Sequence, residues 1–160
     1  MKALLALFIS IITFVSCAQT QTGTEKTNTL NVPVGNPIAP STHESVADFS
    51  EGCFWHAEIV FQSLVGVRDA VSGYAGGTDP NPTYEKVSSG ETGHAETVQV
   101  YYDSTKIDFP TLVAAFFASV DPTTLNRQGY DEGTQYRSIA FYRNPKEKQI
   151  IEAEIKRIID

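Results

Sequence analysis

Cys53 is the residue of this 160-residue chain best suited to nucleophilic chemistry. It stands in Gly52-Cys53-Phe54-Trp55, next to the only tryptophan of the chain. A strand that gives way to a helix here would place its sulfur near the unpaired N–H groups at the positive helix end, which favour the nucleophilic thiolate. The alternative is a buried, unreactive cysteine that acts as a small apolar side chain. The preceding glycine and the two following aromatic residues favour the reactive interpretation.

Glu96 is the second candidate for chemistry. Residues 96–102 alternate in polarity, so Glu96 shares a strand face with Val98 and Val100, which by pattern is the core face. Burial there would raise the pKa of the carboxyl and keep it protonated near neutral pH. Such an acid can give a proton to a substrate oxygen. The alternative is a glutamate at the strand end that turns towards water.

His94 suggests a different chemistry, a Cys–His pair as in thiol hydrolases. A single histidine in a loop is more often structural, so this remains the alternative hypothesis. The chain has three histidines, and Cys53 is the one cysteine we expect to stay available, so we predict no metal site. A deaminase-type zinc motif would also need Pro-Cys-x-x-Cys, which this sequence lacks.

The elements that must position these residues follow from periodicity and turn residues. We predict strands at 45–49, 67–74, 96–102 and 138–142, and helices at 54–66, 108–119 and from Asn144 onward, the last with the stripe Ile151, Ile155 and Ile158. Their order is that of an α+β fold, the ferredoxin-like split βαβ plait (βαββαβ), with an additional C-terminal helix.

The N-terminal residues resemble an export signal. Residues 1–17 combine Lys2 with an apolar run too short to span a bilayer with ease, and they end in the lipobox-like Phe14-Val15-Ser16-Cys17. We therefore expect an exported protein of the cell envelope, a lipoprotein anchored through Cys17. An ordinary cleaved signal, with a periplasmic or secreted product, is the alternative. Residues 18–44 predict a flexible linker, and residues 45–160 predict one domain.

The charge and the cysteine count limit the partners. A net charge of −7 argues against nucleic acid and against anionic lipid, so we expect membrane association only through the lipid anchor. Exported proteins usually pair their cysteines, so an odd one suggests a reactive thiol. We expect a monomer.

Several motifs resemble those of the A-type peptide methionine sulfoxide reductases, in family order. They are Gly-Cys-Phe-Trp-His-Ala-Glu at 52–58, Gly-Tyr-Ala-Gly-Gly at 73–77, Asn-Pro-Thr-Tyr at 81–84, Thr-Gly-His-Ala-Glu at 92–96 and Gly-Thr-Gln-Tyr-Arg-Ser at 133–138. The likeness extends over nearly everything from Phe49 to Ser138.

The resemblance implies roles for single residues. Cys53 would attack the sulfur of methionine-S-sulfoxide, free or in proteins, and become a sulfenic acid, while Glu96 protonates the oxygen. Tyr84 and Tyr136 match tyrosines that hydrogen-bond this oxygen. Asp131, which lies in a polar, glycine-punctuated loop, matches a substrate-pocket position. The residues expected to form the apolar methyl pocket are Phe54 and Trp55. On this interpretation His94 belongs to the scaffold.

The sequence departs from the family pattern in two ways. His56 stands where the family most often has a small residue such as glycine. The chain also ends at Asp160, whereas relatives usually continue into a segment that often carries resolving cysteines. We therefore expect no cofactor and recycling by an external thiol such as thioredoxin or dithiothreitol. The remaining alternative is a catalytically impaired envelope protein that retains the fold.

Overall fold

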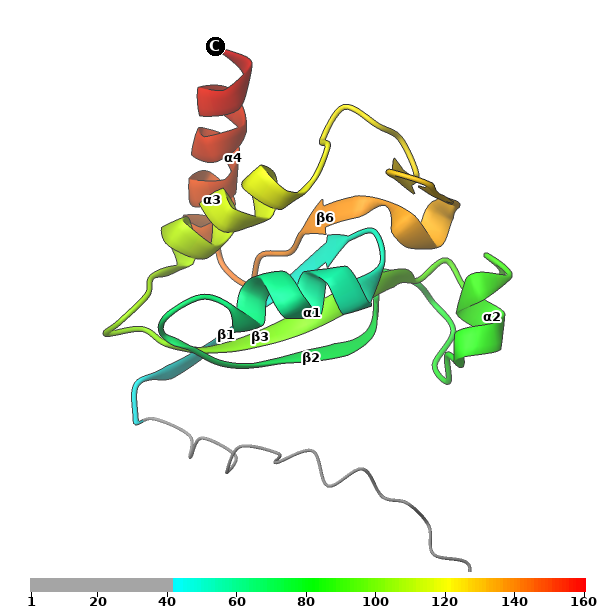
Figure 1. Cartoon of the computed structure of the whole chain (residues 1–160), viewed down its shortest axis with the longest axis horizontal. Coiled ribbons are helices and arrows are strands. Elements are labelled where there is room, and N and C mark those ends of the chain that lie inside the picture. Colours follow the sequence, from blue (N-terminus) through cyan, green and yellow to red (C-terminus); the bar gives the residue numbers. More distant parts are fainter. Residues whose placement is uncertain (1–41) are drawn as a thin grey trace, which may run out of the picture. The chain divides into compact units, whose positions relative to one another are not determined.

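A computed structural model describes residues 42–160, and the structural statements below concern that part of the chain (Figure 1). The strands are β1 (Glu44–Glu51), β2 (Val67–Ala75), β3 (Ala95–Asp103), β4 (Arg127–Gln128), β5 (Asp131–Glu132) and β6 (Ser138–Ala140). The helices are α1 (Phe54–Gln62), α2 (Tyr84–Ser88), α3 (Phe109–Ser119) and α4 (Pro145–Ile159), with a 3₁₀ turn, η1, at Thr134–Tyr136.

Four strands form an antiparallel sheet in the order β2-β3-β1-β6. Since β3 lies between β1 and β2, those two strands run parallel and are joined by α1 as a crossover. This is the split βαβ arrangement. The predicted fold class, an α+β ferredoxin-like plait with an additional C-terminal helix, is therefore confirmed.

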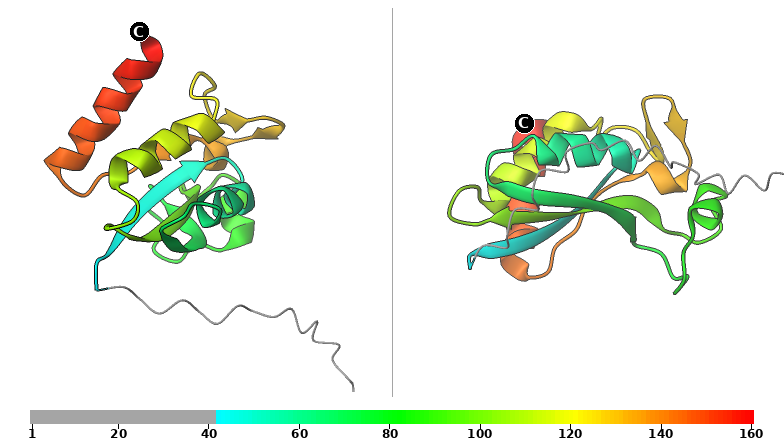
Figure 2. Two further views of the ribbon diagram at one scale, coloured as in Figure 1. Left: turned by 60° about the vertical axis from the view of Figure 1, so that its left-hand side comes forward. Right: turned by 60° about the horizontal axis from the view of Figure 1, so that its bottom comes forward.

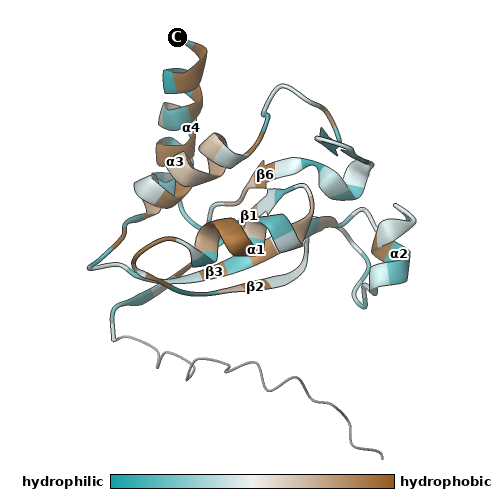
Figure 3. Cartoon of the chain, viewed as in Figure 1, coloured by the Kyte–Doolittle hydropathy of each residue, from teal (hydrophilic) through white to brown (hydrophobic). Residues whose placement is uncertain are grey.

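The core lies between this sheet and the helices α1 and α3, and Phe49 of β1 is at its centre. The ring of Phe49 stacks on Phe61 of α1 at a centroid distance of 4.9 Å and on Phe116 of α3 at 5.4 Å. Val98, opposite Phe49 on β3, is also fully buried. Figure 3 shows the apolar stretch of α1 lying over the sheet. This packing holds the end of β1, and therefore the turn at Cys53, against a rigid base.

Helix α4 begins where the sequence predicts, but its apolar stripe is only partly buried. The side chain of Asn144 accepts a hydrogen bond from the backbone N–H of Glu147 at 3.0 Å, which is an N-cap, and Pro145 is the first helical residue. Of the predicted apolar stripe, however, only Ile151 is buried, whereas Ile155 and Ile158 are 37 % and 39 % exposed. These two line an open groove of about 750 Å³ between α3, β6 and α4.

Several short elements were not predicted. The expected loops at 75–94 and 122–137 contain α2, the β4–β5 hairpin and η1, which lie beside one end of the sheet (Figure 2). Helix α1 also ends at Gln62, earlier than expected, and β1 already begins at Glu44. The predicted signal, the lipidated Cys17 and most of the linker lie outside the described residues. Within residues 42–160, no helix is long and apolar enough to span a membrane.

Candidate active site

Cys53 occupies the N-cap of α1, in the turn between β1 and the helix. Its backbone is extended (φ −62°, ψ 120°), and its side chain caps no N–H group. Gly52 before it has φ +88°, and a Cβ there would come within 2.7 Å of the Cβ of Gln128. Glycine is therefore required both for the backbone conformation and for the close approach of β4. The turn leaves the thiol partly exposed at the start of the helix.

Glu96 lies directly beside this turn. It is the second residue of β3 and only 2 % exposed, and its Oε2 accepts a hydrogen bond from the backbone N–H of Phe54 at 3.0 Å. Burial raises the pKa of Glu96, the Phe54 N–H opposes that rise, and the charge of Asp131 adds to it. The carboxyl is thus hydrogen-bonded to the residue next to Cys53, and its burial stabilises the protonated form relative to a carboxyl in water.

Tyr136 and Tyr84 belong to the same group of side chains. Burial raises the pKa of Tyr136, and the charges of Glu96, Asp131, Tyr84 and Cys53 raise it further, in that order. The five groups are therefore near enough for their charges to interact. Tyr136 ends η1 and is partly buried, whereas Tyr84 begins α2 and is 49 % exposed.

The two tyrosines come from separate segments that polar contacts join. Gln135, which is 7 % exposed, donates from Nε2 to the carbonyl of Ser88 at 3.3 Å and so links η1 to α2. Arg137 donates from Nη2 to the carbonyl of Gly93 at 2.9 Å. The residues on either side of Tyr136 thus hold it against the segment that leads into β3.

Phe54, Trp55 and Tyr74 form an aromatic row next to the thiol. The ring centroid of Phe54 lies 5.9 Å from that of Trp55 and 5.8 Å from that of Tyr74. Phe54 is buried and Trp55 is 64 % exposed, so the row runs from the core to the surface. Sequence reasoning did not assign Tyr74 to the site. It lies opposite Glu96 in the β2–β3 register, a pairing that the local pattern does not reveal.

Asp131 is exposed on β5. Asp131 and Cys53 line a pocket of about 210 Å³, together with Glu51, His56, Ser119, Gln128 and Gly129. Glu51 was also not singled out from the sequence. The signal was present, because Glu51 follows Phe49 by two residues on a strand whose alternate residues face the core.

His94 lies outside this group. Its Nδ1 accepts a hydrogen bond from the backbone N–H of Gly77 at 3.2 Å, so Nε2 carries the proton and donates to the carbonyl of Asp79 at 2.9 Å. Both ring nitrogens are therefore used to hold the loop at 77–79. This arrangement leaves no nitrogen for a pair with Cys53 and disfavours the hydrolase alternative.

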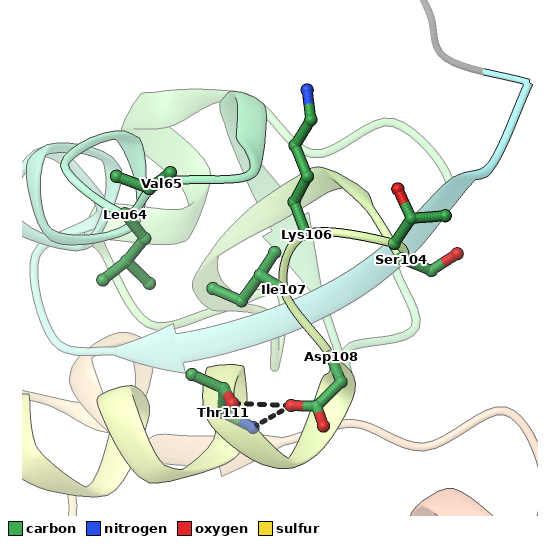
Figure 4. A pocket seen from close by; sticks show the side chains of 8 residues that line it. Leu64, Val65, Ser104, Lys106, Ile107, Asp108 and Thr111 are labelled. Atoms are coloured by element: carbon green, nitrogen blue, oxygen red, sulfur yellow. Dashed lines mark hydrogen bonds between the residues drawn. The ribbon is translucent and has the colours of Figure 1, made fainter.

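Other parts of the described chain offer less chemistry. A hollow of about 530 Å³ at the opposite end of α1 contains neither cysteine nor histidine (Figure 4). It is lined by Leu64, Val65, Ser104, Thr105, Lys106, Ile107, Asp108 and Thr111. Among residues 42–160, no cluster of three or more His, Cys, Asp or Glu side chains could hold a metal ion.

Comparisons with known proteins agree with this geometry. The family model for peptide methionine sulfoxide reductase matches residues 45–160. A peptide methionine sulfoxide reductase MsrA of Picrophilus torridus is 52 % identical over 106 residues, which are 66 % of this chain and 60 % of that protein. One from Rhodopirellula baltica is 49 % identical over 72 % of this chain and 60 % of its own length. The chain thus spans about 60 % of the length of these relatives.

The fold is also similar to that of solved structures. Methionine sulfoxide reductase A of Corynebacterium diphtheriae superimposes with a TM-score of 0.67 at 36 % identity, covering 74 % of this chain and 59 % of that one. Mxr1 of Saccharomyces cerevisiae in its reduced form gives a TM-score of 0.65 at 31 % identity, covering 74 % and 71 %.

Proposed function

Because the chain belongs to the peptide methionine sulfoxide reductase family, we propose that it reduces methionine-S-sulfoxide, free or in proteins, to methionine. The observation that most supports this activity is the hydrogen bond from the Phe54 N–H to Glu96. It holds a buried acid beside the Cys53 turn. A nucleophile and an acid with a raised pKa are the two groups that the reaction needs.

The first half of the proposed reaction transfers oxygen from substrate to enzyme. The Cys53 thiolate attacks the sulfoxide sulfur while Glu96 protonates the sulfoxide oxygen. The S–O bond of the substrate breaks, and the oxygen ends on Cys53 as a sulfenic acid. Methionine leaves reduced by two electrons, and Cys53 is oxidised by two.

The surrounding side chains fit a role in binding this substrate. The hydroxyl groups of Tyr84 and Tyr136 would donate to the sulfoxide oxygen before and during protonation. The faces of Phe54 and Trp55 offer the S-methyl group an apolar surface, which a charged group would enter at a cost. Because Trp55 is largely exposed, it can also contact the chain around a methionine sulfoxide within a protein.

The second half regenerates Cys53. Cys53 is the only cysteine among residues 42–160, so no second thiol within them can resolve its sulfenic acid. We propose that an external thiol does so, either a thioredoxin-like protein or, in vitro, dithiothreitol. Mxr1 of S. cerevisiae has been solved in complex with Trx2, which supports a protein reductant for this fold. The proposal includes no prosthetic group.

For the whole chain we propose an envelope protein, anchored by a lipid on Cys17 and monomeric, that repairs oxidised proteins. The lipobox-like residues before Cys17 support the anchor. A Cys17→Ala variant should then fail to incorporate labelled palmitate and should leave the membrane fraction. Sedimentation of residues 42–160 should give the mass of one chain. Label on the variant would contradict the anchor, and a dimer mass would contradict the monomer.

The test of the activity compares substrates and reductants. Residues 42–160 should turn over methionine-S-sulfoxide with dithiothreitol and leave the R epimer unchanged. A Cys53→Ser variant should be inactive on both. No methionine from the S epimer under any reductant would contradict the proposed function.

A further inference from the structure

Glu51 is a buried acid beside Cys53 to which the reaction above gives no role. It ends β1, is 3 % exposed and lines the 210 Å³ pocket that also contains Cys53. Among residues 42–160, its Oε1 is the one buried side-chain nitrogen or oxygen atom without a hydrogen-bond partner. An unpaired buried oxygen is costly, so its position at a reactive thiol needs a reason.

The surroundings of Glu51 favour its protonated form. The hydroxyl of Ser119 lies 2.7 Å from Oε2 of Glu51 and 2.8 Å from the carbonyl oxygen of Phe116. A serine hydroxyl has one hydrogen, and the Phe116 carbonyl can only accept. The hydroxyl therefore shares its hydrogen between Oε2 of Glu51 and the Phe116 carbonyl, which leaves Glu51 with one shared donor and Oε1 with none, too little to offset the burial of a carboxylate charge. Consistently, burial raises the pKa of Glu51 to about 7, and the hydrogen bond with Ser119 opposes the rise.

The reducing half of the cycle needs a proton just as the first half does. When a thiolate attacks a sulfenic acid, the departing oxygen leaves as water only if it receives one. Glu96, which is hydrogen-bonded to the Phe54 N–H, serves the substrate, whereas Glu51 lines with Cys53 a pocket to which Glu96 does not contribute. Because Cys53 itself lines that pocket, its sulfenic acid forms at the wall of the pocket that contains Glu51.

Building on the proposed function, we propose that Glu51 is the acid of the reducing half: it protonates the oxygen that leaves Cys53 when an external thiolate attacks the sulfenic sulfur. A sulfur–sulfur bond forms and the sulfur–oxygen bond of Cys53 breaks. The attacking sulfur is oxidised, the sulfur of Cys53 is reduced, and the hydroxyl with the proton of Glu51 leaves as water. Glu51 recovers a proton from solvent, and a second thiolate releases Cys53 from the mixed disulfide.

Other titratable groups face the same pocket and must be separated from Glu51. They are Cys53 itself, His56 of α1 and Asp131 of β5, whereas α3 and β4 contribute the non-titrating Ser119 and Gln128. Histidine is the side-chain type whose ordinary pKa lies closest to neutral pH, which makes His56 the control. A pH effect must therefore be assigned with variants of both Glu51 and His56.

The experiment observes the two halves separately. The sulfenic acid is formed with one equivalent of methionine-S-sulfoxide, then mixed with excess 2-mercaptoethanol, and its decay is followed by dimedone labelling and mass spectrometry. For the wild type, the rate constant per thiolate should fall as pH rises through about 7. The rate of methionine release from Glu51→Gln should lie within about two-fold of the wild-type rate. Its sulfenic acid should decay at least ~10-fold more slowly than that of the wild type and without this pH dependence. Glu51→Asp should keep the pH dependence, and the exposed Glu91→Gln should match wild type.

Three results would overturn the proposal. The first is decay of the sulfenic acid of Glu51→Gln at the wild-type rate. The second is an equal loss of rate in methionine release and in sulfenic acid decay. The third is a pH dependence of the decay that disappears in His56→Asn instead. Should Glu51→Gln fail to fold, the pH profiles of wild type and His56→Asn decide alone. A wild type that releases no methionine would contradict the proposed function instead. In that case hydrogen peroxide supplies the sulfenic acid and the test of Glu51 continues.

Discussion

The carboxyl group of Glu96 accepts a hydrogen bond from the backbone N–H of Phe54 at 3.0 Å and so joins the second residue of β3 to the first residue of α1. Cys53, the N-cap of that helix, is the residue immediately before Phe54. One hydrogen bond therefore fixes the position of the buried acid relative to the nucleophile. Cys53 and Glu96 are 43 positions apart in the sequence, and the sheet brings them together.

Glu96→Gln should separate acid catalysis from folding. The amide oxygen of glutamine can still accept the Phe54 N–H, but the side chain has no proton to give. We expect methionine formation in a single turnover to slow by at least ~100-fold, with a urea midpoint close to that of wild type. Rapid quench and urea titration measure the two quantities. Methionine formation by Glu96→Gln at the wild-type rate would show that Glu96 is not the proton donor.

Trp55→Ala should weaken substrate binding with little effect on stability. Its side chain is 64 % exposed, so truncation gives up little buried area in the free protein. For a peptide containing methionine-S-sulfoxide, we expect KM to rise about 10-fold and the single-turnover rate to change less. Ile59→Ala, on the same helix and 70 % exposed, is the matched control and should leave KM unchanged. Equal effects of both substitutions would argue against a specific contact.

His94→Ala should affect stability rather than chemistry. The imidazole joins the N–H of Gly77 to the carbonyl of Asp79, so its removal leaves two backbone groups without their partner. We expect a loss of about 1–3 kcal/mol in the free energy of unfolding. Methionine release at 25 °C should stay within about three-fold of wild type. A loss of methionine release in a folded His94→Ala variant would instead support a Cys–His pair.

Glu51 should make the stability depend on pH. Burial raises its pKa from 4.5 to about 7, so between these values the folded state binds more protons than the unfolded state. Its contribution to stability is therefore complete below about pH 4.5 and is lost as pH rises to about 7. A shift of this size corresponds to about 3 kcal/mol. Urea unfolding from pH 4.5 to 8 should show a smaller decline for Glu51→Gln than for wild type. Parallel curves would show that Glu51 does not titrate in this range.

Much of the framework could be predicted from the sequence because it depends on local patterns. The alternation around Val98 correctly placed Glu96 on the core face, and Asn144 and Pro145 correctly marked the start of α4. The position of Cys53 between a strand and a helix followed from the glycine before it and the periodicity after it.

The remainder depends on contacts between distant residues. Helix α2 has five residues, too few to be stable alone, and its attachment to η1 through Gln135 cannot be read from local periodicity. Tyr74 joins the site only through the register of β2 against β3. The exposure of Ile155 and Ile158 likewise depends on how α4 packs against α3, which the helical pattern leaves open.

A single turnover without reductant tests directly whether Cys53 takes the oxygen of methionine-S-sulfoxide. Residues 42–160 and an excess of the sulfoxide are mixed, and methionine and the intact protein mass are measured together. We expect one equivalent of methionine per chain and one added oxygen on Cys53, with neither in Cys53→Ser. Methionine without oxygen on Cys53, or no methionine from the folded wild type, would contradict this oxygen transfer.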